Sequence, residues 1–104
     1  VRFIATKVDL DVNQAKTLAQ KLRTSGDDVL TVLATQNGDK VNLIISISDA
    51  LVSSSDLNAG TMIREIAKFV KGGGGGQPFL ATAGGKDANG INNAFSAIKD
   101  LIKM

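Results

Sequence analysis

Five consecutive glycines, Gly72–Gly76, are the part of this chain whose residue types point most directly to chemistry. A main chain without side chains lets a phosphate or a sugar come within hydrogen-bonding distance of peptide N–H groups, and glycine permits positive φ angles. A second pair, Gly84 and Gly85, lies directly before an expected helix, and the first N–H groups of a helix favour anions. The two glycine segments therefore predict a main-chain cradle for a phosphate or a sugar.

Basic residues gather around these glycines. Residues 58–86 contain four basic residues and one acidic residue, a net charge of +3, whereas the rest of the chain has a net charge of −1. Arg64, Lys68 and Lys71 are spaced i, i+4 and i+7, which predicts one face of a helix, and Lys86 follows the second glycine pair. Such an uneven charge distribution favours an anionic partner. The candidate binding residues are Arg64, Lys68, Lys71, Gly72, Gly73, Gly74, Gly75, Gly76, Gln77, Gly84, Gly85 and Lys86.

Several kinds of reactive site are excluded by residues that the sequence lacks. With no histidine and no cysteine, the chain cannot build disulfides, the usual zinc sites, or Ser-His-Asp and Cys-His catalytic arrangements. The acidic pairs, Asp9 with Asp11 and Asp27 with Asp28, are interpreted as turn and capping residues. The P-loop pattern fails because Leu80 stands where its first glycine is required. We therefore predict no catalytic residue, no metal and no cofactor in this domain.

The composition predicts one globular domain over residues 1–104. Of its residues 43% are hydrophobic and 21% are charged, which is too apolar for a disordered chain. No apolar run approaches the roughly 18 residues of a membrane span, and no signal peptide is recognisable. The chain has no cysteine and its composition gives no extracellular hint, so a cytoplasmic protein is expected. The first residue is Val1 and not Met, which suggests a piece of a longer protein.

The elements that must position the glycines follow from hydrophobic periodicity and turn signals. We expect the order β-α-β-β-α-β-α, an α/β domain with a mixed sheet and helices packed on it. Asn37-Gly38 is a strong hairpin signal, and Ile44 makes the second hairpin strand apolar on both faces, which predicts a central strand. The expected strands are residues 2–8, 28–36, 40–48 and 78–83; the expected helices follow Asp9 or Asp11 up to Gly26, span 59–71, and begin at Asp87 or Asn89.

Two simpler explanations of the glycine run compete with the cradle. A linker should separate two domains, but this run separates one helix from one strand, and neither could fold alone. A helix C-cap with a turn needs one or two glycines, and five exceed that need. The cradle is therefore the favoured interpretation.

Residues 57–87, LNAGTMIREIAKFVKGGGGGQPFLATAGGKD, resemble the C-terminal domain of alanyl-tRNA synthetases, which is related to the DHHA1 domains of DHH-type phosphoesterases. The resemblance includes Ala59-Gly60, the basic helix, the glycine run, Pro78 and the segment 81–87. The phosphoesterase branch carries a histidine in its glycine motif, and this chain has none. Gln77 departs from the pattern, which commonly has arginine before the proline.

The resemblance implies a non-catalytic domain that binds tRNA at its outer elbow. The expected tRNA is alanine tRNA. The other partners of the domain would be the catalytic and editing domains of the parent chain. A homodimer through the last helix is the alternative, as is the substrate-binding domain of a DHH-type phosphoesterase. Because the only aromatic residues are four phenylalanines, we expect contacts to phosphates, sugars and RNA shape more than base stacking. Phe79 is left as either a core residue or a stacking surface.

Overall fold

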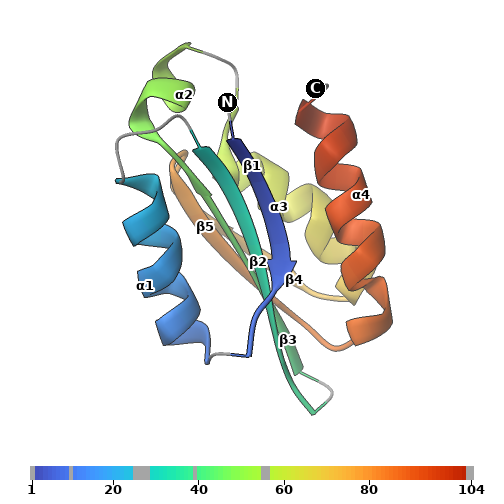
Figure 1. The fold of residues 1–104 in the computed structure, drawn as a ribbon. Helices are drawn as coiled ribbons and strands as arrows, with labels where there is room; N and C mark the ends of the chain where they lie inside the picture. Colours follow the sequence, from blue (N-terminus) through green and yellow to red (C-terminus); the bar gives the residue numbers. More distant parts are fainter. Residues whose placement is uncertain (1, 10, 25–28, 39, 55–56, 103–104) are drawn as a thin grey trace.

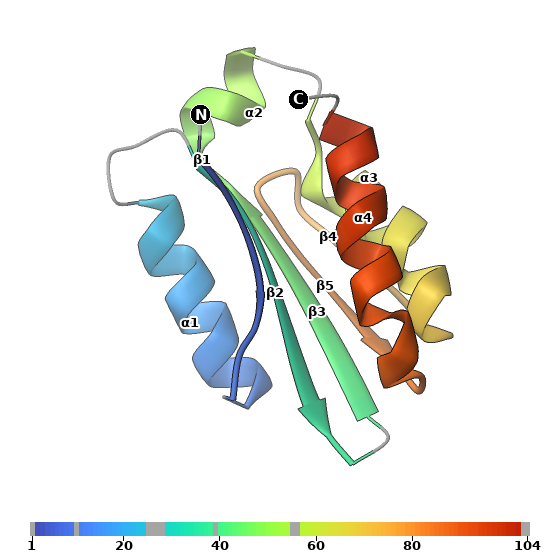
Figure 2. The same cartoon turned by 45° about the vertical axis from the view of Figure 1, so that its right-hand side comes forward.

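A computed structural model describes residues 2–9, 11–24, 29–38, 40–54 and 57–102. It contains a five-stranded mixed sheet with helices on both faces (Figure 1, Figure 2), which confirms the predicted fold class. The strands, in the spatial order β1-β2-β3-β5-β4, are β1 (Arg2–Lys7), β2 (Val29–Asn37), β3 (Lys40–Ile47), β5 (Leu80–Gly85) and β4 (Gly73–Gly76). The helices are α1 (Val12–Arg23), α2 (Asp49–Ser54), α3 (Ala59–Ala67) and α4 (Ile91–Ile102), with 3-10 turns η1 (Lys68–Val70) and η2 (Ala88–Gly90).

The sheet is buried on both faces because the side chains of its central strands alternate between two apolar clusters. Val41, Leu43 and Ile45 of β3 pack with α3 and α4 in the larger cluster. Ile44 points the other way and packs with Leu33 and with α1. The prediction that β3 is the central strand is confirmed, as is the hairpin that joins it to β2.

The starts of α1 and α3 are fixed by short polar side chains that cap them. Asp11 caps α1 in a reciprocal capping box with Gln14, so Asp11 and not Asp9 is the cap. Asn58 caps α3 by accepting a hydrogen bond from the Thr61 N–H at 3.1 Å. The expected helix end at Gly26 lies outside the described residues; α1 ends at Arg23.

The structure corrects the sequence prediction at three places. The segment 49–58, for which no helix or strand was expected, contains a short helix, α2. The expected helix 59–71 ends at Ala67 and continues as the η1 turn. The strand expected at 78–83 lies at 80–85, and the glycine run forms a strand of its own, β4. The last correction matters most, because it converts the expected glycine loop into the edge of the sheet.

Candidate nucleic-acid interface

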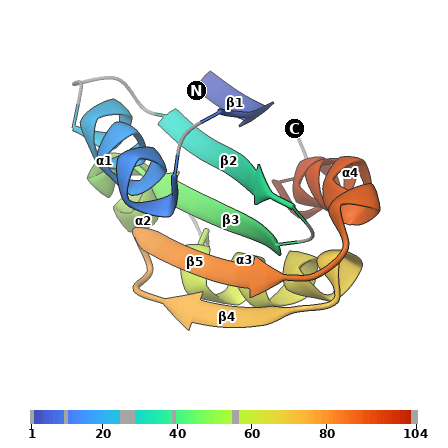
Figure 3. The same ribbon diagram turned by 90° about the horizontal axis from the view of Figure 1, so that it is seen from below.

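The glycine strand β4 lies at one edge of the sheet, antiparallel to β5 (Figure 3). The Gln77 N–H donates to the Leu80 carbonyl at 2.9 Å, where this two-stranded ribbon turns. The Gln77–Leu80 pair is hydrogen-bonded, and bonded and non-bonded pairs alternate along an antiparallel ladder. Gly74 is opposite Ala83 in a non-bonded pair, so its N–H is directed away from β5. Gly74 is also exposed to solvent. At Gly74 the edge therefore presents a main-chain N–H directed away from β5, on a residue that has no side chain.

Alternate glycines of the run are required by close contact with β5. A Cβ at Gly72 would lie 1.7 Å from the Gly84 carbonyl oxygen, and a Cβ at Gly74 would lie 2.2 Å from the Thr82 carbonyl oxygen. At Gly76 the same atom would lie 2.6 Å from the Leu80 carbonyl oxygen. These three glycines therefore allow the strand to approach β5 more closely than any side chain would permit.

The other two glycines of the strand have no such requirement. A Cβ at Gly73 would meet no atom within 4 Å, and a Cβ at Gly75 would first meet the Arg64 guanidinium at 3.6 Å. Positive φ does not explain them either: among the described glycines only Gly38 has one, at 63°. The fold thus explains three of the five glycines by packing, and it leaves Gly73 bare without a structural reason.

The basic residues predicted to share a helix face lie in different environments. Arg64 is exposed on α3 and places its guanidinium beside Gly75. Lys68 pairs with Glu65 at 3.6 Å, and its ammonium lies 5.6 Å from the centre of the Phe69 ring. Both ends of the Lys68–Glu65 pair are largely exposed, so we assign this pair little energy.

Lys71 does not belong to the helix face at all, which corrects the i, i+4, i+7 prediction. It has φ 56° and ψ 48°, the left-handed conformation that normally selects glycine. The Lys71 N–H donates to the Lys68 carbonyl and the Gly72 N–H donates to the Ala67 carbonyl, which is the Schellman pattern of a helix end. The side chain of Lys71 is exposed and leaves the helix at the start of β4.

Lys71 and Lys86 come together around a hollow at the end of the sheet. Its lining includes Gly72, Gly84 and Gly85. The two segments meet because the Lys86 and Asp87 N–H groups donate to the Val70 carbonyl at 2.7 and 3.0 Å. The structure therefore assembles these two lysines and three glycines of the predicted site in one place.

The helical segment after Gly85 begins where it was expected. Asp87 is the N-cap of η2, and its carboxylate accepts a hydrogen bond from the Asn89 N–H. The main-chain N–H groups of Lys86 and Asp87 are already bonded to Val70, so Lys86 can reach an anion only through its side chain. Gly85 serves packing, since a Cβ there would lie 2.4 Å from the Val70 carbonyl oxygen.

Gln77 and Phe79 lie at the opposite end of β4, next to the turn. Gln77 is exposed. Phe79 is half-buried and lines a separate hollow with Thr17 and Gln20 of α1, so it is neither a full core residue nor an open stacking surface. These two residues are therefore apart from the hollow around Lys71 and Lys86.

Two further residues of the hollow, Lys40 and Asn42 on β3, were missed from the sequence. Neither is near the glycine run in the chain, and only the pairing of β3 with β5 brings them there. In the part of the chain that the structure describes, no three histidine, cysteine or acidic residues gather as a metal site would require. No helix in that part has the length and apolar content to cross a bilayer.

Comparison with known proteins matches residues 1–104 to the DHHA1 domain. The chain belongs to the DHHA1 family. This DHHA1 domain is 45% identical to an alanine–tRNA ligase of Christiangramia forsetii over 103 residues, and 46% identical to that of Cytophaga hutchinsonii over 105 residues. The matches cover 99% and 100% of the chain but only 12% of either ligase, so the chain spans about one eighth of the length of these relatives.

The fold of this DHHA1 domain agrees with a solved structure. The crystal structure of the C-Ala domain from Aquifex aeolicus alanyl-tRNA synthetase superimposes with a TM-score of 0.83 at 30% identity, covering 95% of this chain and 86% of that one. The resemblance to the C-terminal domain of alanyl-tRNA synthetases is therefore confirmed. In this DHHA1 domain Arg64 lies beside Gly75 of the glycine strand, and Lys71 and Lys86 line the hollow where that strand begins.

Proposed function

We propose that this chain is the non-catalytic, tRNA-binding C-terminal domain of a cytoplasmic alanyl-tRNA synthetase, whose other domains carry out aminoacylation and editing. The observation that supports the proposal best is the bare strand beside cations. Gly73 is exposed and a Cβ there would meet no atom within 4 Å, Arg64 lies over Gly75, and Lys71 and Lys86 meet where the strand begins. Main-chain N–H groups flanked by cations suit a sugar–phosphate backbone.

The proposed recognition is by shape and backbone contact. The glycines allow ribose and phosphate groups to approach the peptide groups, and the cations neutralise phosphates. The wide, shallow minor groove of folded RNA presents 2′-hydroxyls to such a surface. The outer elbow of tRNA is the folded surface that we propose it grips, which would hold alanine tRNA for the two reaction centres of the parent enzyme.

The alternative role as a dimerisation module finds less support. The apolar face of α4, which could have joined a second copy, buries Ile91, Ala94 and Ile98 in the chain's own core. The edge strand β4 remains open, but four glycines offer a second copy main-chain bonds and almost no apolar area.

The experiment is a gel-shift titration of the 104-residue chain with an alanine-tRNA transcript, repeated with a microhelix of its acceptor stem alone. We expect the whole tRNA to bind, with the microhelix at least about tenfold weaker because it lacks the elbow. Log K should fall with log salt by roughly 0.7–0.9 per phosphate neutralised. Size-exclusion chromatography with and without tRNA is the companion measurement.

Three outcomes would count against the proposal. A self-associated chain that ignores tRNA supports the dimerisation module instead. Equal affinity for the tRNA and the microhelix would show that the chain does not bind the elbow. Binding that does not respond to salt removes the phosphate contacts.

A further inference from the structure

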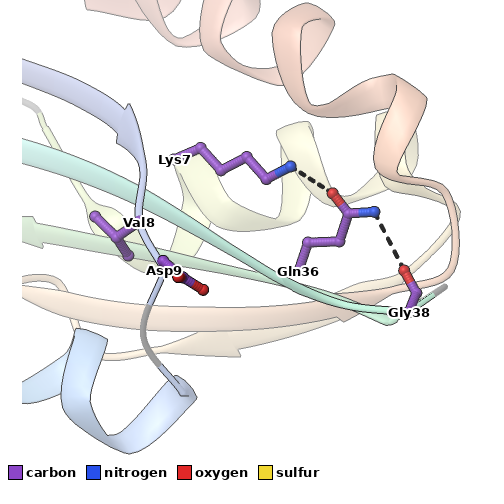
Figure 4. A pocket seen from close by; sticks show the side chains of 5 residues that line it. All are labelled: Lys7, Val8, Asp9, Gln36 and Gly38. Atoms are coloured by element: carbon purple, nitrogen blue, oxygen red, sulfur yellow. Dashed lines mark hydrogen bonds between the residues drawn. The ribbon is translucent and has the colours of Figure 1, made fainter.

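The hollow around Lys71 and Lys86 continues across the end of the sheet. A neighbouring hollow shares Lys71 and Lys86 and adds Gln36 and Gly38. The next one shares Gln36 and Gly38 and adds Lys7, at the end of β1 (Figure 4). We name this surface the lysine groove and define it by Lys7, Gln36, Lys40, Asn42, Lys71 and Lys86.

Lys7 is held in the groove by two hydrogen bonds in series. Its ammonium donates to the Gln36 side-chain oxygen, and the Gln36 side-chain nitrogen donates to the Gly38 carbonyl at 3.2 Å (Figure 4). An ammonium has three donors, so one bond to a neutral amide leaves two N–H groups and the full positive charge for a ligand. Lys7 is therefore a positioned cation without a carboxylate partner in this contact.

The charge of the groove is positive. Within the described residues, the charged residues that line its three hollows are the four lysines of the groove and two carboxylates, Asp9 and Asp87. The Asp87 carboxylate already accepts a hydrogen bond from the Asn89 N–H. Both Lys7 and Lys40 are exposed.

The backbone conformation of Lys71 is an independent indication that its side chain has a role in the groove. A left-handed residue at a helix end is usually glycine, because a Cβ is strained in that conformation. The chain places lysine there although five glycines follow directly. A strained position that keeps a charged, exposed side chain indicates a binding role for that side chain.

We propose that the lysine groove binds a run of the phosphodiester backbone of RNA, with Lys7 and Lys40 as contacts beyond the glycine strand. The proposal rests on the proposed function, since it extends the same interface. The hollows run in the order Lys40, then Lys71 with Lys86, then Gln36 and Lys7, so an RNA strand leaving the glycine edge at Lys71 and Lys86 would meet Lys40 on one side of the sheet end and Lys7 on the other.

The test compares two double charge reversals with equal change in net charge. The groove variant is Lys7→Glu with Lys40→Glu, and the control variant is Lys21→Glu with Lys99→Glu, on the exposed surfaces of α1 and α4. The probe is an alanine-tRNA transcript titrated at several salt concentrations. We expect the groove variant to bind roughly tenfold or more weakly, with the salt slope flattened by about 1.5 for two lost phosphate contacts. The control should change the affinity less than about threefold, through long-range charge alone.

The outcomes separate the two proposals. If both variants lose affinity equally, or if the groove variant keeps the parent's salt slope, the groove proposal is wrong while the tRNA-binding function stands. If the parent chain itself does not bind tRNA, both are wrong. A circular-dichroism melting curve for each variant excludes unfolding as the cause of a lost affinity, and Lys7→Gln with Lys40→Gln provides a milder pair in case the reversals disturb the fold.

Discussion

Replacement of Gly74 by alanine should lower the free energy of unfolding by about 3 kcal/mol or more, whereas the same change at Gly73 should leave it unchanged or raise it by up to about 1 kcal/mol. The new Cβ at Gly74 would lie 2.2 Å from the Thr82 carbonyl oxygen and 2.5 Å from the Ala83 Cα, and both are backbone atoms that cannot rotate away. At Gly73 it would meet nothing within 4 Å. The two residues are neighbours in one strand of identical glycines, so composition and exposure are matched.

Urea denaturation followed by circular dichroism measures both changes. A pair of equal, small effects would show that β4 is not held against β5 at the observed distance. Gly60 offers an intermediate comparison, because its Cβ would lie 3.0 Å from the Gly76 carbonyl oxygen, a contact that a small shift could relieve.

Reversal of both Lys71 and Lys86 should weaken tRNA binding by about two orders of magnitude near 0.1 M salt, and it should flatten the slope of log K against log salt by roughly 1.5. The two lysines meet at the hollow where the glycine strand begins, so they lie on the proposed path of the RNA backbone. Gel-shift titration at graded salt gives both quantities.

The variant Lys71→Gly separates binding from folding. Glycine removes the strain of a left-handed Cβ, which costs about 1–2 kcal/mol, although it also adds freedom to the unfolded chain. The melting temperature should therefore hold or rise while the affinity for tRNA falls several-fold. A variant that is equally stable and binds as tightly as the parent would show that the Lys71 side chain does not contact the RNA.

The parts of the fold that follow from side-chain patterns were predictable. Ile44 adds an apolar residue to the second face of β3 and so identifies a strand buried on both faces, and Asn37-Gly38 fixes the hairpin. Asp11 and Asn58 mark the starts of α1 and α3, because short polar side chains accept hydrogen bonds from the first free N–H groups of a helix.

The glycine strand could not be predicted because a run of glycines has no pattern. Strand prediction depends on the alternation of side chains, and glycine is depleted from strands. Here β4 pairs with β5 only because side chains are missing at Gly72, Gly74 and Gly76. The end of α3 was hidden for the opposite reason, since lysine and not glycine occupies the left-handed position at residue 71.

The residues of the candidate site that are close together in the sequence were predictable, and those that are far apart in the sequence were not. The sequence brings Lys71, Lys86 and the glycines together because they are close in the chain. Lys7 and Lys40 reach the same surface only through the parallel pairing of β1 with β2 and the antiparallel pairing of β3 with β5. No local signal marks either lysine, since isolated surface lysines are ordinary.

The central claim is that RNA lies directly against the bare main chain of β4. Amide chemical-shift mapping of the ¹⁵N-labelled chain during titration with alanine tRNA tests it residue by residue. We predict the largest shifts or line broadening at Gly72–Gly76 and at Lys71 and Lys86, with the buried Gly60 and Gly90 little changed. Shift changes confined to α1, which packs on the face of the sheet opposite α3 and α4, with the β4 glycine signals unchanged, would contradict the account.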